Sequence, residues 1–407
     1  MIITIFEDQN SHSLYPLNHV RASFELRCGV FTNLERIQHN LTSNDEIQLF
    51  VRDEIKSIIR ERFPHYTVNP DALSPGIWLN GQVLWTKDDI QKISLDRTFT
   101  HKGRVIAIHN SKTIPISEVF NFIGNVASVS MEMDVSFIDY TWDLIFMQDE
   151  IIRSDSQDIV DHQSGKIHPS VVLENADNIY MAESSEIRPG VVLDASTGPI
   201  IISDHVLVDI GSLIQGPVYI GPDCTINPGA KLRKNVTLGP MCKIGGELES
   251  VIFQGYGNKQ HDGFLGHSYV GEWVNIGAGS NQSNLKNNYS NIKFNFGNQI
   301  IDTKRMFLGS LIGDYTRIAI CTAFNSGTCI GMGSNIFNHD FCPTKLPANH
   351  HANEFIDTGL VEIHSATQLR DNKYLVVGIA ILLLREFHDP IFLPFQIAFL
   401  FRGEQRQ

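Results

Sequence analysis

The stretch ISDHVLVDIGSLIQGPVYIGPDCTINPGAKLRKNVTLGPMCKI, residues 202–244, places an aliphatic side chain at every sixth position. These positions are Ile202, Val208, Ile214, Ile220, Ile226, Leu232, Leu238 and Ile244. The same spacing returns at Val270 and Ile276, and again from Ile312 to Ile336. A period of six fits neither an α-helix nor a simple alternating strand, and it is typical of a parallel β-helix built from hexapeptides.

Three hexapeptides would close one triangular coil of about 18 residues, with one aliphatic side chain pointing inward from each face. Gly, Asn and Asp follow many of these positions, and such residues tolerate the left-handed backbone of tight corners. Each coil would bury its core only against its neighbours. We therefore predict a left-handed parallel β-helix over residues 163–345; an ordinary β-sandwich with a chance spacing is the alternative.

The repeat breaks over residues 245–263 and 285–306, which do not keep the period. Breaks in a solenoid usually become loops that project from one side, and binding residues collect on such loops. We therefore expect the functional residues of the β-helix near these two segments.

Residues 1–155 show a different pattern, in which short apolar runs alternate with helical spacing. Residues 47–51, 77–85 and 104–109 look like strands, and residues 30–41 and 118–126 look like helices. Strands alternating with helices indicate an α/β domain with a largely parallel, covered sheet.

The composition bears on the kind of binding partner and on the cellular compartment that we expect. The formal net charge of −13 gives no general attraction to nucleic acid or to an anionic membrane. Six cysteines without a C-x-x-C pair fit reduced thiols in a cytoplasmic protein. The opening MIITIFEDQN lacks the basic and apolar regions of a signal peptide.

Residues 346–407 form a tail to which the sequence assigns no structure. Its apolar runs at 374–384 and 390–401 are shorter than the roughly 18 residues that span a bilayer. We expect buried or partner-covered segments rather than membrane association; a membrane hairpin, or an end foreign to the fold, are the alternatives.

The segment HDGFLGHSYVGEWVNIGAGSNQSN, residues 261–284, resembles the acetyltransferase half of bifunctional N-acetylglucosamine-1-phosphate uridyltransferase/glucosamine-1-phosphate acetyltransferases. The resemblance implies that His261 is the catalytic base and that Phe264 takes the place of an aromatic residue of that family. It also implies that Asn275 and Asn284 hold the acceptor sugar, although asparagine is equally common at solenoid corners.

The segment SLYPLNHVRASFELRCGVFTNLERI, residues 13–37, is similar to the part of sugar nucleotidyltransferases that follows their glycine-rich loop. The resemblance implies an α/β nucleotidyltransferase-like domain in which Arg21 and Arg27 bind a sugar phosphate. The alternative is that both arginines form ordinary ion pairs.

Several departures from that family point to a degenerate nucleotidyltransferase site. Residues 6–13, FEDQNSHS, replace the glycine-rich loop and carry two acids that would repel a triphosphate. Asn80-Gly81-Gln82 lacks the carboxylate that the family uses for Mg²⁺, and Asp139 or Asp143 could supply only one. Mg²⁺ is therefore expected only if this domain is active.

Acyl transfer to an amine needs a base of near-neutral pKa, donors for the oxyanion and cations for coenzyme A. His261 is the candidate base, and His267 is its rival, more typical of a corner or an interface. Lys259 and Lys286 are candidates for the phosphates of acetyl-CoA or another acyl-CoA; the alternative is two solvated loop lysines. Asn227-Pro228-Gly229 stands where the family has Arg-Pro-Gly, which leaves the acceptor open.

Three functions follow from these observations. The first is an acyl-CoA-dependent transferase, acting on an amino sugar phosphate or nucleotide sugar, with a degenerate nucleotidyltransferase domain. The second is a bifunctional sugar-1-phosphate nucleotidyltransferase/acetyltransferase. The third is a non-catalytic sugar-phosphate-binding or scaffold protein. In each case the resemblance implies a homotrimer whose sites are shared between subunits.

Overall fold

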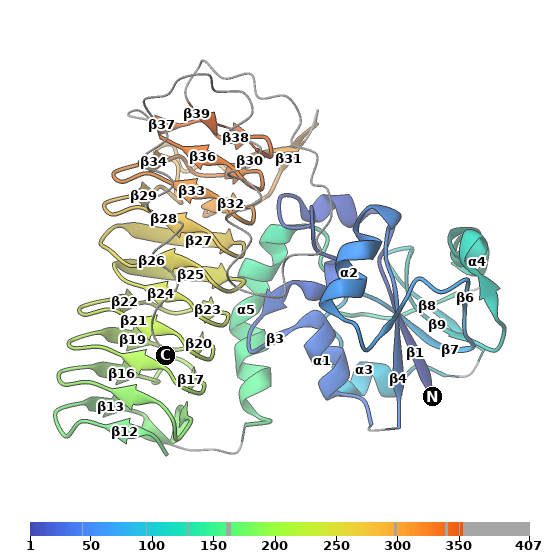
Figure 1. The fold of residues 1–407 in the computed structure, drawn as a ribbon, viewed down its shortest axis with the longest axis horizontal. Coiled ribbons are helices and arrows are strands. Elements are labelled where there is room, and N and C mark those ends of the chain that lie inside the picture. The colour runs from blue at the N-terminus through green and yellow to red at the C-terminus, as the bar shows by residue number, and fades with distance from the viewer. Residues whose placement is uncertain are drawn as a thin grey trace, which may run out of the picture.

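The computed structural model describes residues 1–42, 44–94, 96–127, 130–159, 164–296, 299–337, 341–349 and 351–352. An N-terminal α/β domain is followed by a parallel β-helix, and helix α5 (Thr141–Ser156) lies between them (Figure 1). The predicted fold class is therefore confirmed.

The N-terminal domain is built on a seven-stranded sheet in the order β11-β8-β9-β7-β1-β4-β5. Its strands are β1 (Ile2–Phe6), β4 (Glu46–Phe50), β5 (Thr67–Val68), β7 (Gly76–Asn80), β8 (Thr98–His101), β9 (Arg104–Asn110) and β11 (Ser130–Glu132). Strand β9 runs antiparallel to both of its neighbours, and the other pairs are parallel. The sheet is therefore mixed, with a parallel majority as predicted.

Helices and shorter elements surround this sheet. The helices are α1 (Asn33–His39), α2 (Lys56–Arg62), α3 (Lys87–Gln91) and α4 (Val119–Val126). The short strands are β2 (Arg27–Cys28), β3 (Phe31–Thr32), β6 (Ala72–Leu73) and β10 (Ile114–Pro115). Single 3₁₀ turns span Ser11–Leu14, Ser23–Glu25, Asp53–Ile55 and Ile116–Glu118, and a further one, Ala176–Asn178, lies in the β-helix.

One edge of the sheet gathers polar residues. Strands β1, β4 and β7 are parallel, so their carboxyl ends meet there, and the antiparallel strand β9 begins at the same edge. The residues that follow β1 and β7 and the first residue of β9 are therefore neighbours, although they are far apart in the sequence.

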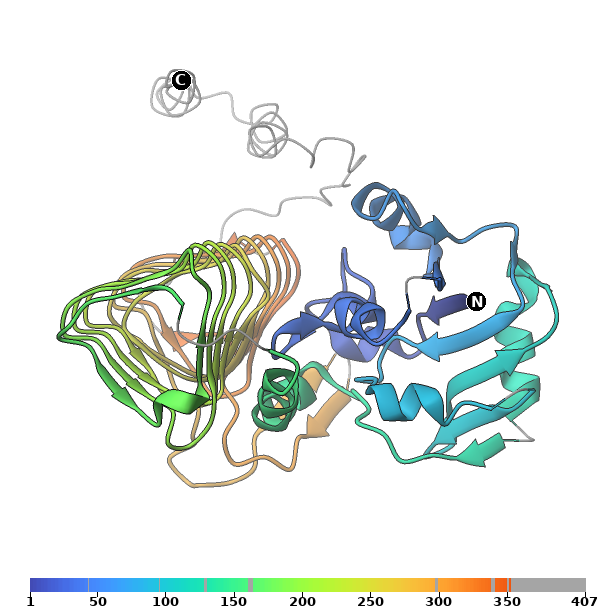
Figure 2. The same cartoon turned by 90° about the horizontal axis from the view of Figure 1, so that it is seen from below.

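The β-helix is a triangular prism with three parallel sheets as faces (Figure 2). Face one contains β12 (Lys166–Ile167), β15 (Glu186–Ile187), β18 (Leu207–Val208), β21 (Thr225–Ile226), β24 (Lys243–Ile244), β26 (Asn258–Lys259), β28 (Asn275–Ile276), β33 (Arg317–Ile318), β36 (Asn335–Ile336) and β39 (His351–Ala352). The last described strand extends beyond residue 345, where we had placed the end of the prism.

The other two faces are completed by strands that follow each corner. Face two contains β13 (Val172–Glu174), β16 (Val192–Asp194), β19 (Leu213–Gln215), β22 (Lys231–Leu232), the first halves of β25 (Glu247–Phe253) and β27 (Phe264–Val270), β29 (Asn281–Gln282), β34 (Ala323–Phe324) and β37 (Phe341–Cys342). Face three contains β14 (Ile179–Met181), β17 (Ile200–Ile202), β20 (Val218–Ile220), β23 (Val236–Leu238), the second halves of β25 and β27, β32 (Ser310–Ile312), β35 (Thr328–Ile330) and β38 (Lys345–Leu346).

The aliphatic residues at every sixth position point into the prism. All eight of the opening stretch are buried in one continuous hydrophobic core, which runs on through Val270, Ile276 and Ile312. Burying one such side chain contributes about 1.5–3 kcal/mol. The prism therefore depends on the stacking of its coils rather than on any one of them.

The two breaks in the repeat behave differently. Residues 285–306 leave the prism and form an antiparallel hairpin, β30 (Lys293–Phe296) and β31 (Gln299–Asp302), as expected of an insertion. Residues 245–263 do not project, which corrects our expectation: β25 and β26 stay in register with the coils on either side. This coil is shortened, because Lys259 lies 15 residues after its register partner Ile244.

Face three is covered by the N-terminal domain. Its outward side chains Ile252, Tyr269 and Leu311 pack with Trp142 and Ile145 of α5 in one buried cluster. Farther along the same helix, Ile152 packs with Ile201 and Tyr219. The two domains therefore share a hydrophobic interface, whereas faces one and two are not covered by this domain (Figure 2).

None of the helices described here is both long enough and apolar enough to cross a membrane. The apolar runs at 374–384 and 390–401 lie outside the described residues.

Candidate functional sites

His261 lies at the corner between face one and face two, just after β26. It is exposed, and its own carbonyl oxygen accepts a hydrogen bond of 2.9 Å from Nζ of Lys259. The neighbouring coils reach the same corner, since Gly279 donates its backbone N–H to the carbonyl of Asp262. The imidazole therefore stands on a rigid corner of the prism and is accessible to a ligand.

Lys259 points into the prism instead of toward solvent. It is 2% exposed, and its ammonium donates to the carbonyl oxygens of Gly245 and His261 at 3.4 and 2.9 Å. Burial lowers the pKa of this lysine to about 8. An ammonium held in this way supports the His261 corner, and it is poorly placed for the coenzyme A phosphate role that we predicted.

Phe264 and Asn284 both pack against Gly266, and Asn284 contacts His267 rather than the side chain of His261. A Cβ built on Gly266 would lie 2.6 Å from both Nδ2 of Asn284 and the ring of Phe264, which shows how closely these groups pack. Nδ2 of Asn284 is 2.9 Å from Nδ1 of His267, whose ring stacks on Phe307 at a centroid distance of 5.4 Å. Burial lowers the pKa of His267 to about 4, so this imidazole is neutral at pH 7.

Asn275 and Lys286 complete the predicted residues of the β-helix. Asn275 is exposed at the start of β28, on the outer surface of face one. Lys286 lies on the insertion after β29, where its ammonium donates to the carbonyl of Asn291 at 3.3 Å. Neither side chain contacts His261 in any described hydrogen bond, and their predicted roles stay predictions.

Arg21 joins the two domains. Its guanidinium lies 3.2 Å from Glu272 and 3.3 Å from Asp314, which occupy the same corner of successive coils of the β-helix. The side chains of Arg21 and Asp314 are 4% and 2% exposed. Two carboxylates raise the pKa of Arg21 well above its usual value. This arrangement matches the ion-pair alternative for Arg21.

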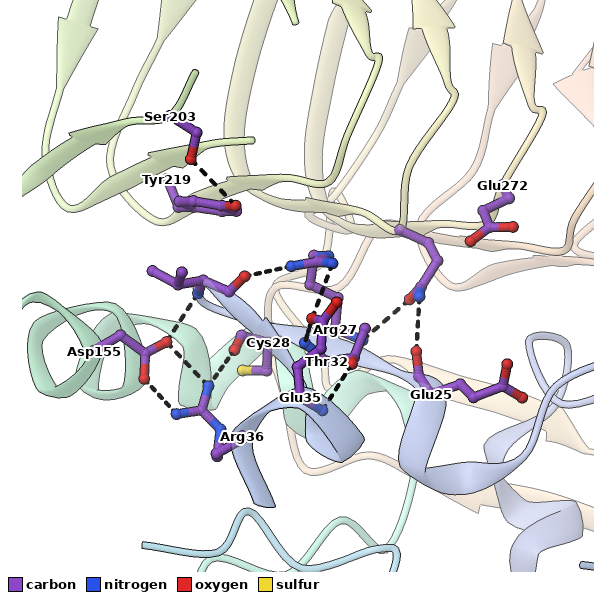
Figure 3. A network of polar contacts seen from close by, with 12 residues as sticks. Glu25, Arg27, Cys28, Thr32, Glu35, Arg36, Asp155, Ser203, Tyr219 and Glu272 are labelled. Atoms are coloured by element: carbon purple, nitrogen blue, oxygen red, sulfur yellow. Dashed lines mark hydrogen bonds and ion pairs between the residues drawn. The ribbon is translucent and has the colours of Figure 1, made fainter. Parts of the chain in front are cut away.

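Arg27 lies at the same interface (Figure 3). Its backbone N–H donates to Oε1 of Gln254 and to the hydroxyl of Tyr269, while its guanidinium pairs with Glu35 at 3.3 Å. Arg21 and Arg27 both line an interdomain cleft of about 450 Å³ together with Tyr256. The side chain of Arg21 and the backbone of Arg27 therefore contribute to domain docking. A sugar phosphate would have to compete with the carboxylates that both guanidinium groups hold.

A second cluster lies at the carboxyl edge of the N-terminal sheet; we call it the strand-edge cluster and define it as Asp8, Asn80, Gln82, Arg104 and Asp139. Arg104 is its centre, with Nη1 2.9 Å from Asp139 and Nη2 3.1 Å from Asp8. Arg104 was not among the residues predicted from the sequence. It was missed because a strand-initial arginine gains its neighbours only from the antiparallel pairing of β9 with β7.

The acids of residues 6–13 are neutralised, which corrects the expectation that they would repel a triphosphate. Glu7 is 2% exposed and pairs with Arg52, and Asp8 pairs with Arg104. The carboxylate of Asp143 accepts the backbone N–H groups of Asp139, a member of the strand-edge cluster, and of Tyr140 at the start of α5. Burial raises the pKa of Asp143 to about 6.

Residues 3–163 match the model of a family described as sugar nucleotidyl transferase. A curated relative, the bifunctional sugar-1-phosphate nucleotidylyltransferase/acetyltransferase of Sulfurisphaera tokodaii, is 34% identical over 98 residues. That alignment covers 23% of this chain and 24% of the relative, so the chain spans about a quarter of the length of the curated relative that it matches.

Two solved structures are among those to which the chain is similar. The UDP-N-acetylglucosamine acyltransferase from Campylobacter jejuni is 15% identical, with a TM-score of 0.20, over 40% of this chain and 68% of its own. The acetyltransferase domain of PglB from Neisseria gonorrhoeae, in complex with acetyl coenzyme A, is 11% identical, with a TM-score of 0.14, over 69% and 89%. The part of the chain that matches the sugar nucleotidyl transferase family, residues 3–163, is thus joined to a parallel β-helix of hexapeptide coils.

Proposed function

We propose that the β-helix transfers an acyl group from an acyl-CoA to the amine of a sugar phosphate or nucleotide sugar. His261 would take a proton from the amine as its nitrogen bonds to the thioester carbonyl. The C–S bond then breaks, and the released thiolate of coenzyme A takes up a proton. The observation that carries this proposal is an exposed histidine on a coil corner, where the buried ammonium of Lys259 holds the backbone carbonyl of His261.

His261 suits the role of base better than His267. A base works best when its pKa lies near the working pH. The pKa of His267 is lowered to about 4, and the imidazole is enclosed by Phe307 and Asn284. We assign His267 to the packing of the insertion against the prism.

The test follows the free thiol of coenzyme A during turnover of acetyl-CoA with a panel of amino sugar phosphates and nucleotide-linked amino sugars. His261→Ala should lose about 10²- to 10⁴-fold in kcat, the usual contribution of a general base. His205→Ala is the matched control, because His205 is also an exposed histidine at a corner of the prism. Full activity in His261→Ala would remove the proposed base, and loss in His267→Ala alone would transfer the role.

A second function, nucleotidyl transfer, is favoured by one observation. Arg104 places a guanidinium at the carboxyl edge of the sheet, within residues 3–163, which match the sugar nucleotidyl transferase family. Ligands commonly bind at this edge of parallel sheets. Release of pyrophosphate from a nucleoside triphosphate and a sugar 1-phosphate would support a bifunctional enzyme, and its absence would favour a binding domain.

We also propose that the chain forms a homotrimer through the corner that carries His261. Ile210 and Ile320 lie at this corner and are 54% and 69% exposed. Exposed apolar side chains in a row mark surfaces of association. A neighbouring subunit at this corner would complete a cleft around His261.

A further inference from the structure

We propose that Arg104 acts as a permanent cation in the N-terminal domain. Its guanidinium lies between Asp8 and Asp139 and excludes a divalent metal ion from that position. The inference deepens the proposed role of this domain: the strand-edge cluster would bind a phosphorylated sugar or nucleotide without a bound metal. It concerns a site that is separate from the acyl-transfer corner.

The guanidinium contacts groups from three parts of the chain. Nη1 lies 2.9 Å from Oδ1 of Asp139, and Nη2 lies 3.1 Å from Oδ2 of Asp8 and 3.4 Å from Oε1 of Gln82. Asp8 follows β1, Gln82 follows β7, and Asp139 precedes α5. One planar cation thus links the loops that converge at this edge of the sheet.

The position of Arg104 is fixed by its surroundings. Its side chain is 23% exposed, and its guanidinium lies 4.3 Å above the ring of Phe137. Such a cation–π contact adds to the ion pairs. Because an arginine side chain stays protonated at any physiological pH, this positive charge is permanent.

The remaining donor set does not fit a magnesium ion. Mg²⁺ needs oxygen ligands in octahedral geometry at about 2.0–2.1 Å. Asn80 directs its Nδ2 toward Asp8 at 3.2 Å, while its Oδ1 accepts the backbone N–H of Gln82 at 2.9 Å. Asp8 is therefore surrounded by N–H donors, and no group of three His, Cys, Asp or Glu side chains suited to a metal occurs in the described part of the chain.

Removal of the guanidinium should convert the cluster into a cation site. In Arg104→Met, Asp8 and Asp139 would be left as two neighbouring carboxylates without a counter-ion, which favours the binding of a positive ion. An adjacent charge changes the proton-binding constant of a carboxylate by about one to three powers of ten. We expect Mn²⁺ to bind Arg104→Met about 10- to 1,000-fold more tightly than the wild type.

The experiment titrates Mn²⁺ into the full-length protein and follows the electron paramagnetic resonance signal of the free ion. Arg104→Lys, which keeps a positive charge, should behave like the wild type. Arg104→Met/Asp8→Asn should lose the gain seen in Arg104→Met. Arg153→Met is the matched control, because Arg153 also pairs with a carboxylate but lies outside the cluster.

Two results would overturn the inference. One is that the wild-type protein binds Mn²⁺ at a single site and that Asp8→Asn abolishes this binding. This measurement does not depend on the folding of any Arg104 variant. The other is a folded Arg104→Met variant, with a cooperative melting transition, that gains no affinity. Neither result bears on acyl transfer at His261, so the two proposals can fail separately.

Discussion

Lys259 occupies a position that the adjoining coils give to isoleucine. Its register partner in the coil below is Ile244, and Ile276 follows in the coil above. A charged group there is unfavourable for stability, because burial disfavours the ammonium form. A buried lysine at this position is explained if the two carbonyls that it holds, at Gly245 and His261, shape a functional corner.

Lys259→Met should therefore stabilise the protein at pH 7. The folded-state pKa of about 8 lies below the unfolded value of about 10.4, so the unfolded chain binds more protons between these two values. The stability of the wild type rises with pH in that window, and below pH 8 the full cost, on the order of 3 kcal/mol, is present. Lys259→Met should melt at a higher temperature than the wild type at pH 7, with a smaller difference at pH 10.

The matched control is Lys231→Met, which removes an exposed lysine from face two. Its melting temperature should differ little from that of the wild type at either pH. If Lys259→Met is as active in acyl transfer as the wild type, the lysine does not support the His261 corner.

The lowered pKa of His267 predicts a loss of stability at acidic pH. Its folded-state pKa of about 4 lies below the unfolded value of about 6.5, so the unfolded chain binds the extra proton between these values. The wild type should lose up to about 3 kcal/mol as the pH falls from 6.5 to 4, whereas His267→Asn should lack this contribution. The free energy of unfolding of both proteins, measured in urea at pH 7.5 and 4.5, gives the difference; equal losses would show that His267 titrates normally.

At the scale of elements, a buried ion pair joins α5 to α1, while the apolar side chains of α5 pack against the prism. Asp155 accepts from Arg36 of α1 at 3.0 Å and from the backbone N–H of Val30 at 2.8 Å. The side chains of Arg36 and Asp155 face each other (Figure 3). They are 8% and 3% exposed. The helix therefore fixes the segment around Val30 as well as the face of the prism.

Asp155→Ala should destabilise the protein by about 3–5 kcal/mol, because it leaves the guanidinium of Arg36 buried without its partner. Asp149→Ala on the same helix is the control, since Asp149 and Arg153 form an exposed pair worth less than about 1 kcal/mol. Urea denaturation measures both variants. If Asp155→Ala lowers the free energy of unfolding by less than about 1 kcal/mol, water would be able to solvate the guanidinium of Arg36 in place of Asp155.

The same helix shows where reasoning from the sequence stops. The strands at residues 47–51 and 104–109 and the helix at 118–126 could be placed from their apolar spacing, and β4, β9 and α4 lie there. Helix α5 was not predicted. Its apolar side chains contact both the N-terminal domain and the prism, so they do not form the single stripe by which a surface helix is recognised.

At the scale of the whole molecule, the six-residue period predicted the prism. Each inward side chain makes its contacts within its own coil and with the next one, so the repeat is visible in the local sequence. The functional sites could be predicted only in part. Lys259 belongs to a short coil whose changed spacing hid its inward direction, and Arg21 and Arg104 take their partners from segments distant in the sequence. Local patterns carry no information about such contacts.

Assembly is the prediction that belongs to this scale. If subunits meet at the corner of Ile210 and Ile320, Ile320→Glu should shift the mass measured by light scattering from trimer toward monomer, because it buries a carboxylate in an apolar contact. Ile300→Glu is the control, since Ile300 is 70% exposed on the hairpin outside the prism. A monomeric wild type, or a trimer unaffected by Ile320→Glu, would exclude this interface.

The docking of Arg21 also constrains how the prism can change in evolution. A solenoid by itself accepts the gain or loss of a whole coil, since each coil stacks on any other. Here, a coil gained between Tyr219 and Ile252 would shift Glu272 and Asp314 along the axis by about 4.7–4.9 Å, while α5 still held the coils below. The number of rungs in this part of the chain is therefore set by the length of a helix that is not part of the solenoid.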